Sequence, residues 1–290
     1  MKDAPVLHAV EHAFFKALAA GARLPGHATA RAMGRGLGRL THRLAGSRRR
    51  RALANLALAF PEAPEEQRRR WARQSFENLG AQLVDLLSAT RFDAVQLCRR
   101  WTLEGWEHLE SVGPEGRPAL IMGAHLGFWE ILPSAIGLYK GGMAIVVRPL
   151  DNPRLDREID RLRLRFGGST IAKRGAARGM LRTLADGGRA SILIDQRPGP
   201  GEGVEVPFFG QPALTSPLLA RMAMRFELPV LPYFGFPEPG GRYRVVVRPP
   251  IPPESDDPVT LTGRYLAAVE REIRETPGLW LWMHDRWKTR

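Results

Sequence analysis

Cysteine is nearly absent from this sequence. Its 290 residues include one, Cys98, which excludes an internal disulfide framework and a cysteine-based zinc site. CxxC, HExxH and Walker A motifs are missing too, and the glycines at 34, 36 and 38 lack the spacing of a dinucleotide-binding fingerprint. There is no Gly-x-Ser-x-Gly nucleophile motif. We therefore expect chemistry that uses ordinary acid and base side chains, with no metal and no cofactor.

Long apolar runs are also missing. Residues 5–24 place Val6, Val10 and Phe14 at helical spacing, but charged residues such as Lys16 interrupt the run. A transmembrane helix needs about 20 predominantly apolar residues, and a cleavable signal peptide has a different order of basic, apolar and small residues. We expect a helix that lies at a membrane interface.

Acidic residues are scarce near the N-terminus. The net charge is +13, and the first 51 residues hold eleven Lys and Arg against two acidic residues. A local basic cluster fits nucleic acid, an anionic membrane surface or an acidic protein. Arginines alternate with apolar residues in the layout of a basic amphipathic helix in a headgroup region. The arginines are Arg31, Arg35, Arg39 and Arg43, and the apolar residues are Met33, Leu37, Leu40 and Leu44.

These observations predict two parts: a basic amphipathic membrane-associating segment at 1–46 and the main domain at 47–290. The alternative for the segment is a solvated basic face packed on the main domain through its leucines. The glycines at 34, 36 and 38 each weaken a helix by about 1 kcal/mol relative to alanine. This helix is therefore expected to need a membrane or the rest of the protein in order to form.

The main domain begins with helical patterns and then alternates strand-like with helix-like segments. We predict a short helix before Pro61 and a long amphipathic helix over 64–90. The alternation after residue 100 predicts an α/β fold with a central mixed β-sheet flanked by helices. Strands are expected near 118–123, 143–147, 189–194, 204–207, 229–236 and 242–248, and helices near 128–140, 152–166, 175–187, 215–227 and 258–276.

One stretch has the layout of an acid–base site. An apolar strand ends at Gly123, His125 follows at once, and Glu130 comes five residues later at the start of a helical segment. Residues five apart on one helix point about 140° apart, so His125 is expected in the turn, with Gly127 letting the chain fold back. We predict that Glu130 then hydrogen-bonds the imidazole and stabilises its charged form. The alternative is a structural histidine beside an ordinary first-turn acid.

Polar residues follow the other predicted strands. Arg148 and Asn152 come after the second strand, Asp195 and Gln196 after the third, and Phe208 ends the fourth. Ligands in α/β sheets gather at the carboxyl ends of strands, which favours a single site. The alternative is that these are ordinary turn residues.

The chain resembles the lipid A biosynthesis lauroyl/myristoyl acyltransferase family, within the glycerolipid acyltransferase group that carries a His-x4-Asp/Glu motif. Ordered blocks from about residue 48 carry the resemblance. They are Arg51-x3-Asn55-Leu56-x3-Phe60-Pro61-Glu62, Phe76-Glu77-Asn78-Leu79-Gly80, Gly123 to Glu130, Arg148-Pro149 with Asp151-Asn152-Pro153, Arg163-x-Arg165-Phe166-Gly167, Asp195-Gln196 with Val206 to Gly210, Pro229 to Pro232, and Trp280 to Lys288.

This resemblance implies an O-acyltransferase that moves a fatty acyl group from an acyl carrier protein (ACP) or coenzyme A thioester to a hydroxyl of a lipid A precursor. His125 would be the general base and Glu130 its orienting acid, with no covalent acyl-enzyme. Arg148, Asn152, Arg163, Asp195, Gln196 and Phe208 are the predicted substrate-binding residues, and backbone N–H groups near Gly123 and Gly127 are candidates for the oxyanion.

The resemblance also implies a monomer at the cytoplasmic face of the inner membrane, attached peripherally or weakly anchored to its anionic surface. Three other functions remain open. The acceptor would be another lipid, such as a phosphoinositol mannoside, an ornithine lipid or a lysophospholipid; the enzyme would be a thioesterase or lysophospholipase; or the chain would be a basic membrane- or nucleic-acid-binding protein without catalysis. No recognisable nucleic-acid module supports the last option.

Overall fold

The computed structural model describes residues 4–21, 26–89, 92–112, 117–130, 132–140, 142–165, 167–199, 201–254 and 257–287. Three predicted helices end at residues outside these ranges, namely 22–24, Thr90 and Phe166, and so does Lys288 of the last sequence block.

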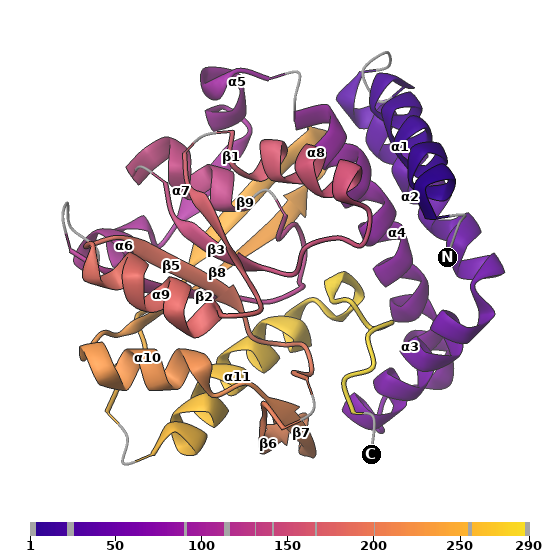
Figure 1. The fold of residues 1–290 in the computed structure, drawn as a ribbon. Coiled ribbons are helices and arrows are strands. Elements are labelled where there is room, and N and C mark those ends of the chain that lie inside the picture. The colour runs from indigo at the N-terminus through magenta and orange to yellow at the C-terminus, as the bar shows by residue number, and fades with distance from the viewer. Residues whose placement is uncertain are drawn as a thin grey trace.

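A seven-stranded sheet forms the centre of the molecule (Figure 1). Its strand order is β1-β9-β8-β2-β5-β3-β4, and only the β8–β9 pair is antiparallel. A separate antiparallel hairpin consists of β6 and β7. The strands are β1 (Trp101–Glu104), β2 (Ala119–Gly123), β3 (Ala144–Val147), β4 (Ser169–Ala172), β5 (Arg189–Leu193), β6 (Val204–Phe208), β7 (Gln211–Thr215), β8 (Val230–Glu238) and β9 (Arg242–Val247).

Helices cover both faces of the sheet and create two hydrophobic cores. Successive residues of a strand point to opposite faces, and in β2 Leu120 and Met122 enter one core while Ile121 enters the other. The larger core contains residues of α3, α4, α9, α10 and α11, and the smaller contains residues of α5, α6 and α7. The helices are α1 (Ala4–Gly21), α2 (His27–Leu44), α3 (Gly46–Ala59), α4 (Glu65–Ala89), α5 (Ala94–Cys98), α6 (Trp106–Val112), α7 (Leu132–Lys140), α8 (Pro153–Arg163), α9 (Ala176–Ala185), α10 (Leu218–Phe226) and α11 (Pro258–Glu275), with 3₁₀ turns η1 (Pro239–Gly241) and η2 (Pro277–Leu279).

The mixed α/β fold predicted from the alternation is confirmed, and every predicted strand has a counterpart. The prediction missed β1, β4 and β7, which have four or five residues each, and the short helices α5 and α6. Such short elements leave too few residues for a periodic pattern. The short turn η1 joins β8 to β9 as an antiparallel pair.

Glycines carry the contact between α2 and α4. A Cβ on Gly38 would collide with the carbonyl oxygen of Phe76, and one on Gly80 with that of Gly34. The two backbones can approach this closely only because these side chains are absent. Two of the three glycines that weaken the isolated helix, Gly34 and Gly38, therefore belong to the surface through which α2 packs on the main domain.

The apolar stripe of α2 faces away from that contact. Met33, Leu37, Leu40 and Leu44 are all exposed, Leu44 to 76%. The alternative in which the segment packs on the domain through its leucines is therefore wrong, because Ala30, Gly34 and Gly38 form the buried side.

The first helix, α1, lies against α8. Lys16 forms an ion pair with Glu158 at 3.0 Å, and the Nδ2 group of Asn152 donates to the carbonyl oxygen of His8 at 2.9 Å. In Figure 1 the indigo and purple helices α1 to α4 form one side of the molecule. Among the residues that the structure describes, no helix is long and apolar enough to cross a membrane.

Candidate active site

The turn after β2 presents His125. Gly127 has a φ of 62°, in the left-handed region that favours glycine, and a Cβ there would collide with the carbonyl oxygen of Gly235. The N–H of Phe128 donates to that same oxygen at 2.8 Å, which fixes the turn against β8. The predicted position of His125 in a turn folded back at Gly127 is confirmed.

Asp195 is the partner of His125. Nδ1 of His125 lies 2.8 Å from Oδ1 of Asp195, and the backbone N–H of His125 donates to Oδ2, also at 2.8 Å. The indole Nε1 of Trp280 donates to Oδ2 at 2.7 Å. Asp195 is 1% exposed, and its three bonds fix the carboxylate in one orientation.

The charge state of this pair follows from its hydrogen bonds. Burial alone would raise the pKa of Asp195, but the bonds from His125 and Trp280 lower it below its usual value. Asp195 is therefore ionised and accepts a hydrogen bond from the protonated Nδ1 of His125. This leaves Nε2 of His125 as the nitrogen that can take a proton. A buried carboxylate in this position also stabilises the imidazolium that forms when Nε2 takes a proton.

Glu130 is held by another residue. Its carboxylate oxygens accept hydrogen bonds from Nε and Nη2 of Arg163 at 3.0 and 3.1 Å. Burial acts against the charged form of Arg163, but Glu130 and Asp160 outweigh this effect and raise its pKa. The predicted hydrogen bond between His125 and Glu130 is wrong, because Glu130 lies in a turn before α7 and points to α8.

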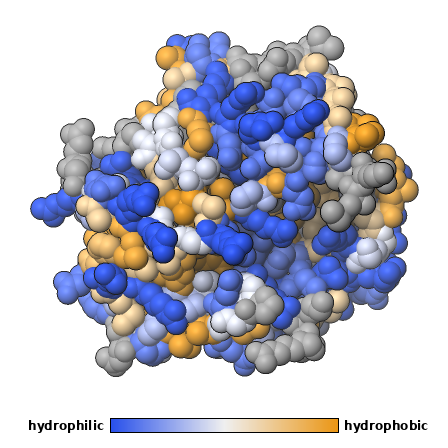
Figure 2. Space-filling model, in the orientation of Figure 1, coloured by the Kyte–Doolittle hydropathy of each residue, from blue (hydrophilic) through white to orange (hydrophobic). Residues whose placement is uncertain are grey.

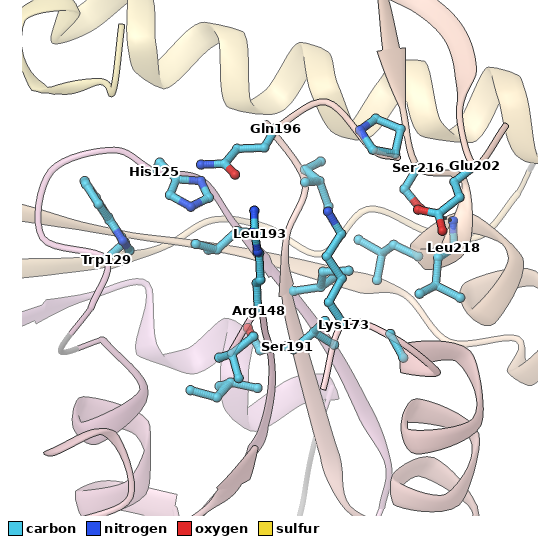
Figure 3. A pocket seen from close by; sticks show the side chains of 18 of the residues that line it. His125, Trp129, Arg148, Lys173, Ser191, Leu193, Gln196, Glu202, Ser216 and Leu218 are labelled. Atoms are coloured by element: carbon cyan, nitrogen blue, oxygen red, sulfur yellow. Dashed lines mark hydrogen bonds between the residues drawn. The ribbon is translucent and has the colours of Figure 1, made fainter. Parts of the chain in front are cut away.

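A cavity of about 650 Å³ opens beside His125. In Figure 3 the rings of His125 and Trp129 lie at one end, and Ser216 and Leu218 lie at the other. Side chains from β3, β5 and β8 form part of its wall. Figure 2 shows that hydrophilic residues cover most of the face drawn there, while hydrophobic side chains appear in its middle. The cavity itself is lined by apolar side chains of the strands together with many polar and charged side chains.

Several predicted site residues line this cavity. Glu130, Arg148, Arg163 and Gln196 do so together with His125. In Figure 3 Arg148 extends alongside Lys173 between the two ends of the cavity. Sheet order accounts for this grouping, because the carboxyl ends of β2, β3, β4 and β5 lie at one edge.

Asn152 is a predicted substrate residue that lies outside the cavity. Its side-chain oxygen caps α8 by accepting from the N–H of Arg154 at 3.0 Å. Its Nδ2 group donates to His8 and, at 2.8 Å, to Glu11. These contacts satisfy the amide, so Asn152 joins α8 to α1 and does not reach a substrate in this structure.

Phe208 and Asp195 also differ from the prediction. Phe208 is fully buried and stacks on Trp287 with ring centroids 5.5 Å apart, so it belongs to the core. Asp195 does not line the cavity; it contacts His125. The predicted oxyanion donors are largely occupied as well, because the N–H of Gly127 donates to Leu279 at 3.0 Å. Gly123 ends β2, and its carbonyl oxygen accepts from Ile194 at 3.2 Å.

The C-terminal segment, residues 279–287, runs beside the His125 turn. The N–H of Leu281 donates to the carbonyl oxygen of His125 at 3.1 Å. Asn78 of α4 donates to the carbonyl oxygens of Gly127 at 3.0 Å and Leu279 at 3.2 Å, so its side-chain amide joins the His125 turn to the C-terminal segment. Asn55 of α3 donates to Trp282 at 2.8 Å and His284 at 2.7 Å. The asparagines of the two earliest sequence blocks thus hold the last block at the site.

Sequence reasoning missed three residues at the site. Trp280 orients Asp195, while Lys173 and His284 line the cavity. Trp280 and His284 belong to a block that carried the family resemblance, which was the available signal. Lys173 follows a strand too short to be predicted. In the described parts of the chain, no group of three or more His, Cys, Asp or Glu side chains is arranged to hold a metal ion.

Comparison with known proteins identifies the class. The model of the family described as bacterial lipid A biosynthesis acyltransferase matches residues 5–289. The chain is 31% identical to the lipid A biosynthesis lauroyltransferase of Escherichia coli K12 over 264 residues, covering 89% of this chain and 85% of that one. It is 28% identical to a lipid A biosynthesis acyltransferase of Haemophilus influenzae over 269 residues, with 90% and 84% covered. The lipid A biosynthesis myristoyltransferase of E. coli K12 is 28% identical over 258 residues, with 88% and 79% covered.

These matches define an O-acyltransferase. The chain belongs to the bacterial lipid A biosynthesis acyltransferase family, as the sequence blocks predicted. Among solved structures, the 1-acyl-sn-glycerophosphate acyltransferase PlsC of Thermotoga maritima matches at a TM-score of 0.41 and 16% identity, over 86% of this chain and 99% of that one. That similarity is too distant for a comparison of the two sites residue by residue.

Proposed function

We propose that this enzyme transfers a fatty acyl group from an acyl-ACP or acyl-CoA thioester to a hydroxyl group of a lipid A precursor. The observation that carries the proposal is His125 bonded to a buried, ionised Asp195 at the wall of the cavity. A base fixed in this way deprotonates a hydroxyl, and the family names supply the lipid class.

The reaction follows from this geometry. Nε2 of His125 takes the proton of the acceptor hydroxyl, and the oxygen attacks the thioester carbonyl carbon. The C=O electron pair moves onto the oxygen and gives a tetrahedral intermediate. When the carbonyl re-forms, the C–S bond breaks, and the imidazolium returns its proton to the thiolate. The thioester supplies the activated acyl group, so the proposal includes no cofactor and no covalent acyl-enzyme.

Arg148 and Lys173 suit a phosphorylated substrate. They follow the register partners Val147 and Ala172 of β3 and β4, so two positive charges lie side by side at the cavity, and Arg148 also forms an exposed ion pair with Asp151 at 3.6 Å. Like charges opposite each other in a sheet repel, and an anion between them relieves this. The phosphate of a glycolipid headgroup or of a phosphopantetheine arm has the required charge.

Glu130 and Arg163 form a partly buried ion pair in the cavity wall. Arg163 is 10% exposed and uses two of its nitrogens on Glu130. In this proposal Glu130 is a positioning residue that fixes Arg163, and the planar guanidinium forms one side of the substrate site.

The N-terminal helices provide the membrane contact. Val6, Leu7 and Val10 of α1 are exposed, as is the leucine stripe of α2. Arg35, Arg39 and Arg43 are exposed beside that stripe and each add ~1 kcal/mol of attraction near an anionic surface, whereas Arg31 is buried and forms an ion pair with Asp85. A lipid acceptor is delivered from a bilayer, so we place the enzyme peripherally on the cytoplasmic face of the inner membrane.

Mass spectrometry of lipid A and phospholipids from a deletion strain tests this function. Restoring the gene should add one acyl chain to lipid A, and a His125→Ala gene should not, because loss of a general base lowers the rate by about 100- to 10,000-fold. Unchanged lipid A with an altered phospholipid or ornithine lipid would assign a different acceptor. Free fatty acid released by the purified enzyme with no acylated lipid would indicate a thioesterase.

A further inference from the structure

His284 lies in the wall of the same cavity as His125, and the reaction described above does not use it. Both polar backbone groups of His284 are hydrogen-bonded. The N–H of His284 donates to Leu281 at 3.3 Å, and its carbonyl oxygen accepts from Nδ2 of Asn55 at 2.7 Å. Leu281 is in turn bonded to the carbonyl oxygen of His125. Leu281 is therefore hydrogen-bonded to both histidines, which fixes the position of the His284 backbone relative to the His125 turn.

The His284 ring presents one nitrogen to the cavity. Nδ1 is buried and has no hydrogen-bond partner among the residues that the structure describes, whereas Nε2 remains accessible. A proton on Nδ1 would be a buried donor without an acceptor, which is unfavourable. The neutral ring therefore carries its proton on Nε2, which makes the accessible nitrogen a hydrogen-bond donor.

The ring is uncharged at neutral pH. Burial lowers the pKa of His284 to about 4; the carboxylates of Asp195 and Asp285 act in the opposite direction, while the charges of His125 and Arg286 lower it further. A neutral donor keeps its proton when charge develops on a substrate next to it. His284 therefore does not compete with His125 for the proton of the acceptor.

The developing oxyanion needs donors of this kind. Three backbone N–H groups of the His125 turn are already used within the protein. His125 donates to Asp195 at 2.8 Å, Gly127 to Leu279 at 3.0 Å and Phe128 to Gly235 at 2.8 Å. Donors fixed toward the oxygen that gains charge are commonly the largest single contribution to catalysis of acyl transfer.

We propose that His284 is a further catalytic residue, whose Nε2–H donates a hydrogen bond to the oxyanion of the tetrahedral intermediate. This inference rests on the proposed acyl transfer. In each turnover His125 moves the proton, while His284 keeps its own and only stabilises charge. The bond is strongest when the thioester oxygen is negative, so it acts on the rate of the chemical step and not on substrate binding.

Two variants of similar size separate donation from shape. His284→Gln retains an N–H donor, and His284→Met does not. With purified protein, an acyl thioester and the lipid acceptor, we expect His284→Met to lose about 100- to 1,000-fold in kcat at an unchanged KM. His284→Gln should retain clearly more kcat than His284→Met. Asp285→Asn, which removes a charge next door and outside the cavity wall, is the control and should retain the wild-type kcat.

Thermal unfolding of each variant shows whether it is folded before the rates are compared. A folded His284→Met protein with wild-type kcat would overturn the role of His284, and so would equal losses in the Gln and Met variants. A rise in KM alone would show ground-state binding and would also overturn it. A wild-type enzyme that transfers no acyl group would overturn the proposed function and this inference together.

Discussion

Asp195 and Glu130 differ in what their carboxylates hold, and this difference predicts different losses. Asp195→Asn keeps the shape but replaces the ionised partner of His125, and a comparable change in a Ser-His-Asp triad costs about 10⁴-fold in kcat. Glu130→Gln weakens only the ion pair with Arg163, so its loss of kcat should be much smaller. Steady-state rates of the two variants with one substrate pair make the comparison. An equal or larger loss in Glu130→Gln would restore Glu130 as the partner of the base.

The order of the strands explains why the sequence alone predicted the wrong partner for His125. His125 and Glu130 are close in the chain, whereas Asp195 is 70 residues away. Gly123 pairs with Leu193 in the parallel β2–β5 ladder, so His125 and Asp195 each lie two residues past a register pair. Strand order decides this neighbourhood, and strand order is not visible in the spacing of residues. The spacing did place His125 correctly in a turn folded back at Gly127, and it placed the polar residues correctly at one shared edge of the strands.

His284 gives the folded state a pH dependence with a definite sign. Its pKa of about 4, a consequence of burial, lies below the ordinary value of 6.5 expected in the unfolded chain. Between these values the unfolded chain binds a proton that the folded chain does not. The contribution of His284 to stability is therefore complete above pH 6.5 and is lost as the pH falls toward 4.

The Tm measured across this pH range should consequently depend less on pH in His284→Gln than in the wild-type protein. Comparing the two proteins removes the contribution of the other titrating groups. If both curves have the same slope, the ring does not lose its charge on folding.

At the level of elements, α2 contains two glycines with opposite expected behaviour, because Gly38 lies in the contact with α4 and Gly36 lies outside it. A Cβ on Gly38 collides with the backbone of Phe76, and Gly38→Ala should destabilise the protein by about 1–3 kcal/mol through overpacking. A Cβ on Gly36 meets nothing within 4 Å, and Gly36→Ala should stabilise the protein by about 0.5–1 kcal/mol because alanine favours a helix. Urea unfolding of both variants gives the two signs. Equal effects would mean that α2 does not pack through this face.

Helix α2 also shows the limit of pattern analysis for elements. The alternation of arginine and leucine starts at Arg31 and predicted the amphipathic character of this helix, but α2 already begins at His27. The pattern did not reveal which face is buried, because the packing surface consists of glycine and alanine, which carry no hydrophobic signal. Asn152 was misplaced for a similar reason, since a helix cap and a ligand contact use the same residue type.

At the scale of the whole molecule, the basic helices and the exposed leucines predict where a bilayer is met. Changing Leu40 and Leu44 together to glutamate should release the protein from anionic vesicles, because it removes apolar contact and adds negative charge. These side chains point away from the domain, so Tm should change little. Sedimentation with vesicles measures the binding. Val95→Glu on α5, also an exposed apolar residue, is the control and should leave binding intact.

Retention of the double variant on vesicles would move the membrane contact away from α2. The division of the chain at residue 46 into a membrane-associating segment and a main domain stays a prediction. In the structure α2 packs closely on α4, and α1 is joined to α8 by an ion pair. Substitutions on the outer face therefore test membrane binding more cleanly than removal of the segment, which would uncover α4.

The C-terminal segment has a consequence for the timing of activity during synthesis. Trp280, which orients Asp195, and His284 leave the ribosome after the sheet and all eleven helices named here. The N-terminal helices are made first, at a chain growth of about 5–20 residues per second, and have time to reach a bilayer before the site is complete. A nascent chain is therefore expected to stay inert toward the thioester until this last segment has been made, by which time the N-terminal helices can already lie on a bilayer.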